Sequence, residues 1–185
     1  GIFENTGVKI GAVSVFDPQT GHYLAEIPVT PAMLGAPEIL TGAEHALSAA
    51  NSTVGAVAYG WRPICAGGSL AVAAGQDGLN RQELYQGWMS DVRVGGQRLA
   101  ADVAWARSEA EGSVPFGEHN FDRFNARVQL AGATSQTDLF AGYQAKFFGW
   151  PNLYTPFNSN ETENLQTLLV AWNHRTDFGR GDFLE

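Results

Sequence analysis

The segment DPQTGHY, residues 17–23, holds an acid, an amide, a hydroxyl and a histidine close together, and these residue types could support catalysis or bind a metal. Nucleophilic catalysis needs a nucleophile, a base and a group that orients the base, and the chain has no nucleophile motif such as G-x-S-x-G. Its four histidines are scattered, without the H-x-x-x-H spacing of a zinc-binding pair. The segment is also too short and too neutral for an EF-hand calcium loop. We therefore predict no catalytic residue, no bound metal and no cofactor, and we do not expect an enzyme.

The same segment has the chemistry of a stable turn. Asp17 can accept main-chain hydrogen bonds, Pro18 fixes its own φ angle, and Gly21 permits a positive φ. Two interpretations stay open: the segment is only a turn, or the turn presents side chains to a ligand. In the second case the side chains that offer donors, acceptors and a ring are Gln19, His22 and Tyr23.

A second candidate contact surface lies in two long loops that the sequence predicts at residues 108–120 and 149–161. Aromatic and polar residues in these loops would line a vestibule that receives a ligand, and packing within the loops is the alternative. The loop residues concerned are Phe116, His119, Trp150, Asn152 and Tyr154. The predicted ligand-binding residues are therefore Gln19, His22, Tyr23, Trp150, Asn152 and Tyr154.

The composition limits the classes of protein that fit. Of the 185 residues, 44% are hydrophobic, which is enough for a packed core. Acids outnumber bases by 19 to 11, and the resulting formal charge of -8 argues against nucleic acid as a partner. The single Cys65 excludes an internal disulfide framework and a multi-cysteine metal site. No apolar run approaches the roughly 18 residues of a membrane-spanning helix.

Strict alternation of apolar and polar residues predicts β-strands in most of the chain. The clearest cases are FDRFNARVQL and TDLFAGYQAKF, in which Phe124, Val128, Leu139 and Tyr143 belong to an apolar face. Helical periodicity is confined to a short helix or helical turn at residues 43–51. The predicted strands are 68–75, 81–92, 97–107, 121–132, 136–148 and 162–176, with a seventh that begins at Gly181.

The connections between these strands favour the meander of an outer-membrane barrel over a soluble sandwich. Tight turns such as GG at 95–96 alternate with longer loops, as in barrels with short turns on one rim and long loops on the other. Aromatic residues gather in strands or at their long-loop ends, where a membrane girdle would lie. The polar face contains Arg123, Arg127, Asp138 and Lys146, which suit a water-filled or protein-filled lumen better than a dry core.

The first 62 residues lack this regular pattern, and the order of their segments resembles the C-terminal half of the plug of a TonB-dependent receptor. In that family a strand enters an apical loop of the DPQTGH type, then a hydrophobic segment with proline, a strand ending Leu-Arg-Gly-Pro, a small-residue turn and a glycine-rich strand. The corresponding segments here are 8–16, 17–23, 25–29, 38–42, 43–51 and 54–61. Further on, LFAGYQAKFFGWPNLYTPF resembles an early barrel strand and outer loop of cobalamin and siderophore transporters. The chain departs from the family at Thr41, which stands in place of the arginine, and at residues 54–56, which replace a double glycine.

The resemblance implies a mainly β fold: part of a plugged transmembrane β-barrel, built as an antiparallel meander, preceded by part of a small α/β plug domain. It implies that residues 1–62 are the C-terminal part of the plug and residues 63–185 the first barrel strands. Because plugged transporters have about 22 strands, we expect the chain to be an internal fragment of a receptor.

The function implied by the resemblance is binding and active import of a scarce nutrient, of the cobalamin or ferric-siderophore class, without covalent chemistry. Its partners would be TonB, through a segment absent from this chain, a small-molecule or metal-chelate ligand, and lipid of a Gram-negative outer membrane. The principal alternative is a soluble β-sandwich that binds carbohydrate through Trp150, Asn152 and Tyr154. A passive porin and an outer-membrane enzyme are weaker alternatives.

Overall fold

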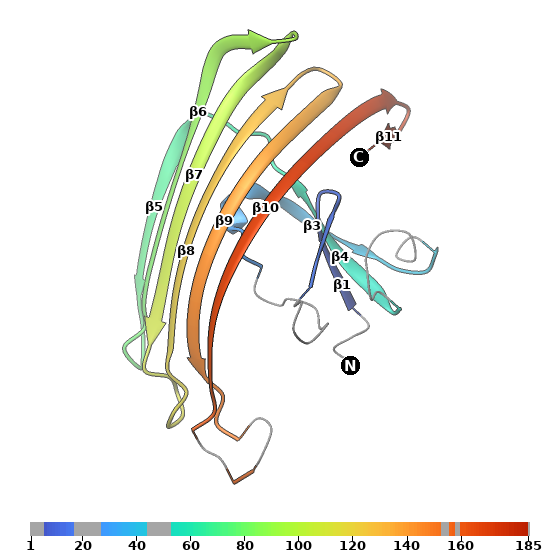
Figure 1. Ribbon diagram of the computed structural model, residues 1–185. Coiled ribbons are helices and arrows are strands. Elements are labelled where there is room, and N and C mark those ends of the chain that lie inside the picture. Colours follow the sequence, from blue (N-terminus) through green and yellow to red (C-terminus); the bar gives the residue numbers. More distant parts are fainter. Residues whose placement is uncertain (1–5, 17–26, 44–52, 153–155, 158–159, 185) are drawn as a thin grey trace.

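The computed structural model describes residues 6–16, 27–43, 53–152, 156–157 and 160–184, and these form two β-sheets (Figure 1). The first sheet is mixed and has the strand order β2-β1-β4-β3, in which β1 runs parallel to β4 and the other neighbours are antiparallel. Its strands are β1 (Thr6–Ile10), β2 (Val13–Val15), β3 (Leu34–Leu40) and β4 (Gly55–Trp61). A single 3-10 turn, η1 (Pro31–Met33), precedes β3. No helix among the described residues is long and apolar enough to cross a membrane.

The second sheet is an antiparallel meander of seven strands that follow one another in chain order. Its strands are β5 (Gly67–Ala74), β6 (Asn80–Val94), β7 (Gln97–Ala110), β8 (His119–Ala131), β9 (Ser135–Gly149), β10 (Thr162–Gly179) and β11 (Asp182–Leu184). The strands are long and strongly curved, and the sheet is open, with β5 and β11 at its edges (Figure 1). The mainly β prediction is therefore confirmed, and each predicted strand of the meander is present.

The two rims of the meander differ as the sequence predicts. The tight turns β6–β7, β8–β9 and β10–β11 lie on one rim, and the longer connections, including residues 111–118 and the described residues between β9 and β10, lie on the other (Figure 1). Gly95 and Gly96 both have positive φ, of 58° and 84°, which is the conformation that a two-residue hairpin turn requires. The helical turn predicted at residues 43–51 lies outside the described residues, except for Ala43.

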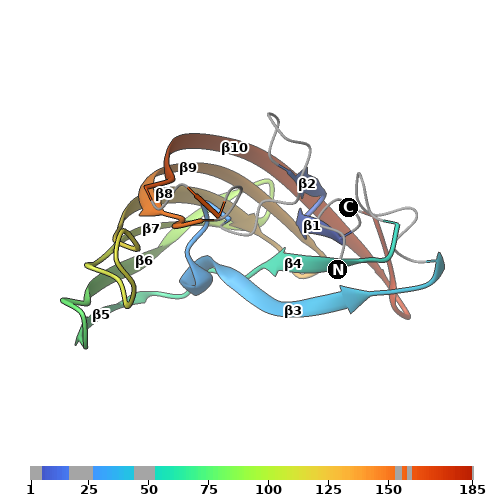
Figure 2. The ribbon, with the colours of Figure 1, turned by 90° about the horizontal axis from the view of Figure 1, so that it is seen from below.

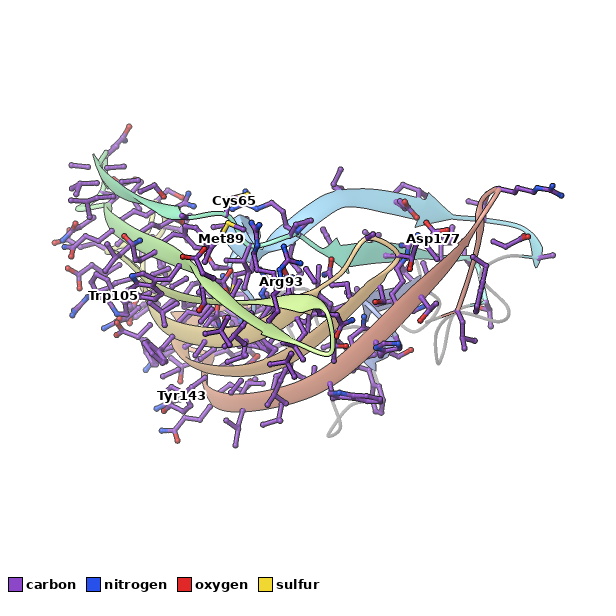
Figure 3. All side chains as sticks on the ribbon, turned by 90° about the horizontal axis from the view of Figure 1, so that it is seen from above. Cys65, Met89, Arg93, Trp105, Tyr143 and Asp177 are labelled. Carbon is purple, nitrogen blue, oxygen red and sulfur yellow. The ribbon has the colours of Figure 1, made fainter. Side chains whose placement is uncertain are left out.

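The two faces of the meander have different compositions, and the predicted alternation is confirmed. Arg127 is 2% exposed, whereas its neighbour Val128 is 45% exposed on the opposite face. The same alternation holds in β9, where Leu139 is 55% exposed and Phe140 is completely buried. Figure 3 shows Trp105 and Tyr143 on the outer, convex side of the curved sheet. The alternation arises because successive side chains of a strand point to opposite faces.

The concave face of the meander curves over the four-stranded sheet (Figure 2). One apolar core joins them, with Ile10, Val29, Met33 and Trp61 from the first part of the chain. From the meander the buried contributors are Tyr85, Ala104, Phe140 and Ala171. Phe140 lies on the face that the sequence pattern predicts as polar, and it is buried there because the ring of Trp61 packs 4.9 Å from its ring centre.

The contrast between the faces predicts the response to two neighbouring substitutions. Phe140→Ala removes a fully buried ring and should lower the free energy of unfolding by about 3–5 kcal/mol. Leu139→Ala, one residue away on the exposed convex face, should change it by only about 0.5 kcal/mol. Urea unfolding followed by tryptophan fluorescence measures both values. Equal losses from the two variants would contradict the assignment of the faces.

Candidate functional site

The ligand-binding residues predicted from the sequence fall in two groups. Gln19, His22, Tyr23 and Tyr154 lie outside the described residues. Trp150 and Asn152 lie in the connection between β9 and β10, on the long-loop rim. The ring of Trp150 is tilted against that of Phe148, with centres 4.8 Å apart. Asn152 is exposed and has φ 58°, which the asparagine side chain tolerates in a turn.

A set of aromatic rings continues from Trp150 along this rim. Phe148 contacts Phe121 edge to face, with ring centres 6.1 Å apart, and Phe121 lies 5.1 Å from the ring of His119. The Nε2 atom of His119 is 3.0 Å from the hydroxyl of Ser108. Phe116, a further predicted vestibule residue, is exposed in the β7–β8 loop. The described residues predicted to line a vestibule thus gather on one rim, and the rings of Trp150 and His119 pack against phenylalanines of the sheet.

The most distinctive polar site is the contact between the concave face and the main chain of the first part of the chain. Asn125 of β8 accepts a hydrogen bond from the Thr30 amide N and donates one to the Pro28 carbonyl O, both at 2.8 Å. An amide side chain can do this because it carries a donor and an acceptor side by side, as a peptide group does. Asn125 therefore takes the place of a neighbouring strand for a segment that contains proline and cannot pair regularly.

Three further amide side chains bind main-chain groups in the same way. Gln129 accepts from the Ile64 amide N at 2.9 Å, and Asn173 accepts from the Ala12 amide N at 2.8 Å. Gln136 donates to the Trp61 carbonyl O at 3.3 Å. These contacts provide partners for main-chain groups at the junction of the two sheets. A buried main-chain group without a partner would destabilise the fold by about 1–3 kcal/mol. We call Asn125, Gln129, Gln136 and Asn173 the amide clamp.

Gly11 shows how closely the two sheets approach at one of these contacts. It has φ 55°, and a Cβ atom added to it would lie 2.6 Å from the side-chain oxygen Oδ1 of Asn173. The Gly11 amide N also donates to the Tyr59 carbonyl O at 2.7 Å, which holds the turn between β1 and β2 against β4. Only glycine combines this φ with this approach.

A buried ion cluster lies beside the amide clamp. Arg127 Nη2 is 2.7 Å from Asp102 Oδ2, and Arg127 Nη1 is 3.4 Å from Asp138 Oδ1. All three side chains are fully buried. The carboxylates have additional donors, since the Tyr85 hydroxyl donates to Asp102 at 3.1 Å. Both Gln129 and Gln136 donate to Asp138 at 2.7 Å.

Trp61 connects this ion cluster to the first sheet. Its ring lies 5.4 Å from the Arg127 guanidinium carbon, a cation–π contact in a site without water access. The Trp61 Nε1–H is buried and has no hydrogen-bond partner among the described residues. Because the same ring also packs on Phe140, one side chain of β4 covers both the charged and the apolar parts of the concave face.

The convex face has the opposite character. In-register pairing aligns Leu84, Trp105, Phe124, Tyr143 and Leu168 into one apolar row across five strands. Four residues farther along the strands, a second row contains Trp88, Ala101, Val128, Leu139 and Trp172. A third, formed by Leu99 and Leu130, lies two residues beyond it. From Phe124 to Leu130 the apolar band spans roughly 20 Å at about 3.3 Å per residue.

Polar rows limit this apolar band on both sides. On the long-loop side Gln82, Arg107 and Asp122 are aligned with one another. On the tight-turn side Thr176 pairs with Ser135, whose hydroxyl accepts a hydrogen bond from Gln97 at 2.7 Å. The exposed apolar surface is thus a continuous band and not a scatter of single side chains, and such a band indicates contact with lipid or with another protein.

Sequence reasoning found part of this site and missed the rest. It placed Arg127 and Asp138 on the polar face, and both are there. It missed Asp102, although Asp102 stands between Ala101 and Val103 in an alternating segment and could have been assigned to the same face. It could not predict that Asn125 and Gln129 bind the main chain of residues far away in the sequence.

The described residues contain no group of three or more His, Cys, Asp or Glu side chains that could hold a metal ion. No family model, curated protein or solved structure matches the chain. The concave face contacts the first part of the chain through side-chain amides and holds beside them a guanidinium whose charge is compensated by carboxylates.

Removing the central cation tests the energetic role of the ion cluster. Arg127→Met leaves Asp102 and Asp138 buried without their cation, and it should lower the free energy of unfolding by about 3–5 kcal/mol. Arg81→Met, which breaks an exposed pair with Glu83, is the matched control and should cost at most about 1 kcal/mol. Urea unfolding of both variants gives the comparison. A loss for Arg127→Met no larger than that of the control would show that the cluster does not stabilise the fold.

Proposed function

We propose that this chain is part of a TonB-dependent receptor of a Gram-negative outer membrane, in which the meander is lipid-facing wall and the first part of the chain is plug. The observation that carries the proposal is the two-sided meander. Its convex face is an apolar band bounded by polar rows, and its concave face is polar and packs on a separate sheet. An outward apolar band of about 25 Å between aromatic girdles is the pattern of a transmembrane barrel wall.

The polar concave face supports the plug part of the proposal. A soluble sandwich buries almost only apolar side chains between its sheets, whereas here the contact contains four amides and three charged groups beside its apolar core. Such a contact suits a folded plug inside a barrel lumen, because water and polar groups also surround the rest of the plug. The soluble carbohydrate-binding alternative would need Trp150 as an open sugar platform, and its ring packs on Phe148.

In the proposed receptor the long loops face outward and receive a scarce nutrient of the cobalamin or ferric-siderophore class. Gln19, His22 and Tyr23 would meet the ligand from the plug, and Trp150, Asn152 and Tyr154 from the loop between β9 and β10. No covalent step is involved. Transport would follow from a population shift, in which the ligand binds more tightly to the plug state that presents the TonB-binding segment.

Lipid contact is tested by placing a charge in the middle of the apolar band. Val128→Arg should reduce the amount of protein recovered in the outer-membrane fraction, because arginine at the bilayer midplane costs about 2–4 kcal/mol. Gln82→Arg, in the polar row, is the control and should leave recovery unchanged. Fractionation of a Gram-negative host and detergent extraction measure the two. A wild-type chain that is recovered folded in buffer without detergent would overturn the membrane proposal.

Ligand contact through the plug turn is tested separately. In the receptor, replacing both His22 and Tyr23 by alanine should weaken uptake of cobalamin or a ferric siderophore by roughly tenfold or more, since each lost polar contact is worth about 1 kcal/mol. Gly21→Val should instead damage the turn itself, because a β-branched residue resists positive φ. Radiolabelled uptake at equal surface abundance gives the result. Unchanged uptake in the double-alanine variant would reduce DPQTGHY to a turn without a binding role.

A further inference from the structure

A groove of about 470 Å³ lies at the tight-turn rim, between the segment that joins the two sheets and the ends of β6, β7 and β8. Ile64, Ala100 and Ala131 give it an apolar lining, and Cys65 and Met89 also line it. Figure 3 shows Cys65, Met89 and Arg93 close to one another at this rim, away from Asp177. None of the predicted ligand-binding residues that the structure describes lines this groove, and Gln129, which donates to Asp138 of the buried ion cluster, lies at its wall.

Two arginines, Arg93 and Arg98, line the groove from neighbouring strands. They are directly opposite each other in the pairing of β6 with β7, so their Cβ atoms are about 5 Å apart. Like charges at this position destabilise a sheet unless a counter-charge lies between them. An anion bound between Arg93 and Arg98 would therefore remove the repulsion between their charges.

A bulge in β6 produces this juxtaposition. Met89 pairs with Ala100 and Arg93 with Arg98, so that three residues of β6 lie opposite the single Leu99 of β7. Bulges re-aim side chains and are common beside binding sites. Here the bulge keeps Arg93 on the face of the groove, opposite Arg98.

No carboxylate of the described residues pairs with either of these two arginines. Arg93 Nη1 donates to the Gly96 carbonyl O at 3.2 Å, and the Arg98 side chain makes no hydrogen bond or ion pair with any described residue. None of the described residues that line the groove is acidic. This is notable in a chain with 19 acids and 11 bases, where most arginines could find a carboxylate.

The long-loop rim provides a contrast within the same sheet. Arg81 pairs with Glu83, and Arg107 pairs with Glu109 at 2.8 Å. In both pairs the carboxylate lies two residues farther along the same strand, on the same face. At the tight-turn rim neither Arg93 nor Arg98 has a carboxylate two residues farther along the chain.

We propose that the groove binds a phosphate group, held by Arg93 and Arg98 together. A phosphate monoester carries close to two negative charges near neutral pH and presents three terminal oxygens, which allows it to accept from two guanidinium groups at once. A carboxylate has one charge and two oxygens, which one arginine satisfies. The apolar lining of the groove would contact the carbon part of a phosphorylated compound. This inference does not rest on the proposed function.

The single cysteine provides a direct readout of occupancy. Cys65 is a free, exposed thiol that lines the groove, and no second cysteine competes for a reagent. A ligand in the groove should shield it from the neutral reagent iodoacetamide. Alkylation followed by mass spectrometry, on the full 185-residue chain, gives the rate against concentration of inorganic phosphate or glycerol 3-phosphate.

Both phosphate compounds should slow the alkylation of Cys65 several-fold in a saturable manner, and potassium chloride at equal ionic strength should not. Arg93→Gln and Arg98→Gln should each raise the half-protecting concentration by about tenfold, the loss expected for a charge-assisted hydrogen bond. Arg81→Gln, which removes an arginine from the other rim, is the matched control and should protect like the wild type. Because Arg93 and Arg98 are exposed, circular dichroism should show unchanged folding in all three variants.

A second arm identifies the source of the phosphate. Dihexanoyl phosphatidic acid carries the same phosphate monoester on a lipid, and it is compared with glycerol 3-phosphate. Protection at a lower concentration of the lipid assigns the groove to a headgroup, and the reverse assigns it to a soluble compound. Protection by neither, or protection that is equal in the wild type and in the Arg93→Gln and Arg98→Gln variants, would overturn the proposal. The outcome of both arms of the alkylation experiment is independent of whether the chain resides in a membrane.

Discussion

The burial of Arg127 between Asp102 and Asp138 is the constraint on which the concave face depends. A guanidinium and two carboxylates without water access are tolerated only when every charge has a counter-charge or donors. The cluster therefore requires Tyr85, Gln129 and Gln136 as donors to its carboxylates. It also requires a cover that excludes water, which the ring of Trp61 supplies. Through these contacts the strands β6 to β9 and the strand β4 are fixed relative to one another.

The amide clamp provides hydrogen-bond partners for main-chain groups, as Tyr85, Gln129 and Gln136 do for the buried carboxylates. The first part of the chain contains prolines and short strands, so many of its peptide groups cannot pair within a sheet. Asn125, Gln129, Gln136 and Asn173 provide those partners from the concave face, and because they bind main chain they do not depend on the side chains opposite them. A surface of this kind can hold an irregular segment in one position, and the apolar core around Met33 and Phe140 packs beside it.

The two faces of the meander then have separate roles. The middle of the concave face is occupied by the contact with the first sheet, whereas at the groove of the tight-turn rim Arg93 and Arg98 have no carboxylate partner among the described residues. The convex face has no partner within the described residues over a band that includes Val128, Leu139 and Trp172, which are 45%, 55% and 68% exposed. A sheet with one polar, occupied face and one apolar, free face needs an apolar environment outside it, and this requirement motivates the proposed membrane location.

The amino-acid sequence was sufficient to predict the strands of the meander, its tight turns and the faces of the side chains in β8 and β9. These depend on local rules: a period of two, and glycines such as Gly95 and Gly96 where a tight turn needs positive φ. Four contacts became known from the three-dimensional structure: Asp102 binds Arg127, Trp61 covers this pair, Asn125 binds Thr30 and Pro28, and a bulge places Arg93 opposite Arg98. The partners in the first three contacts come from segments far apart in the sequence, and the fourth depends on a local shift in strand register. Alternation gives the face on which a side chain lies, but the strand pairing and the docking of the two sheets determine what it meets there.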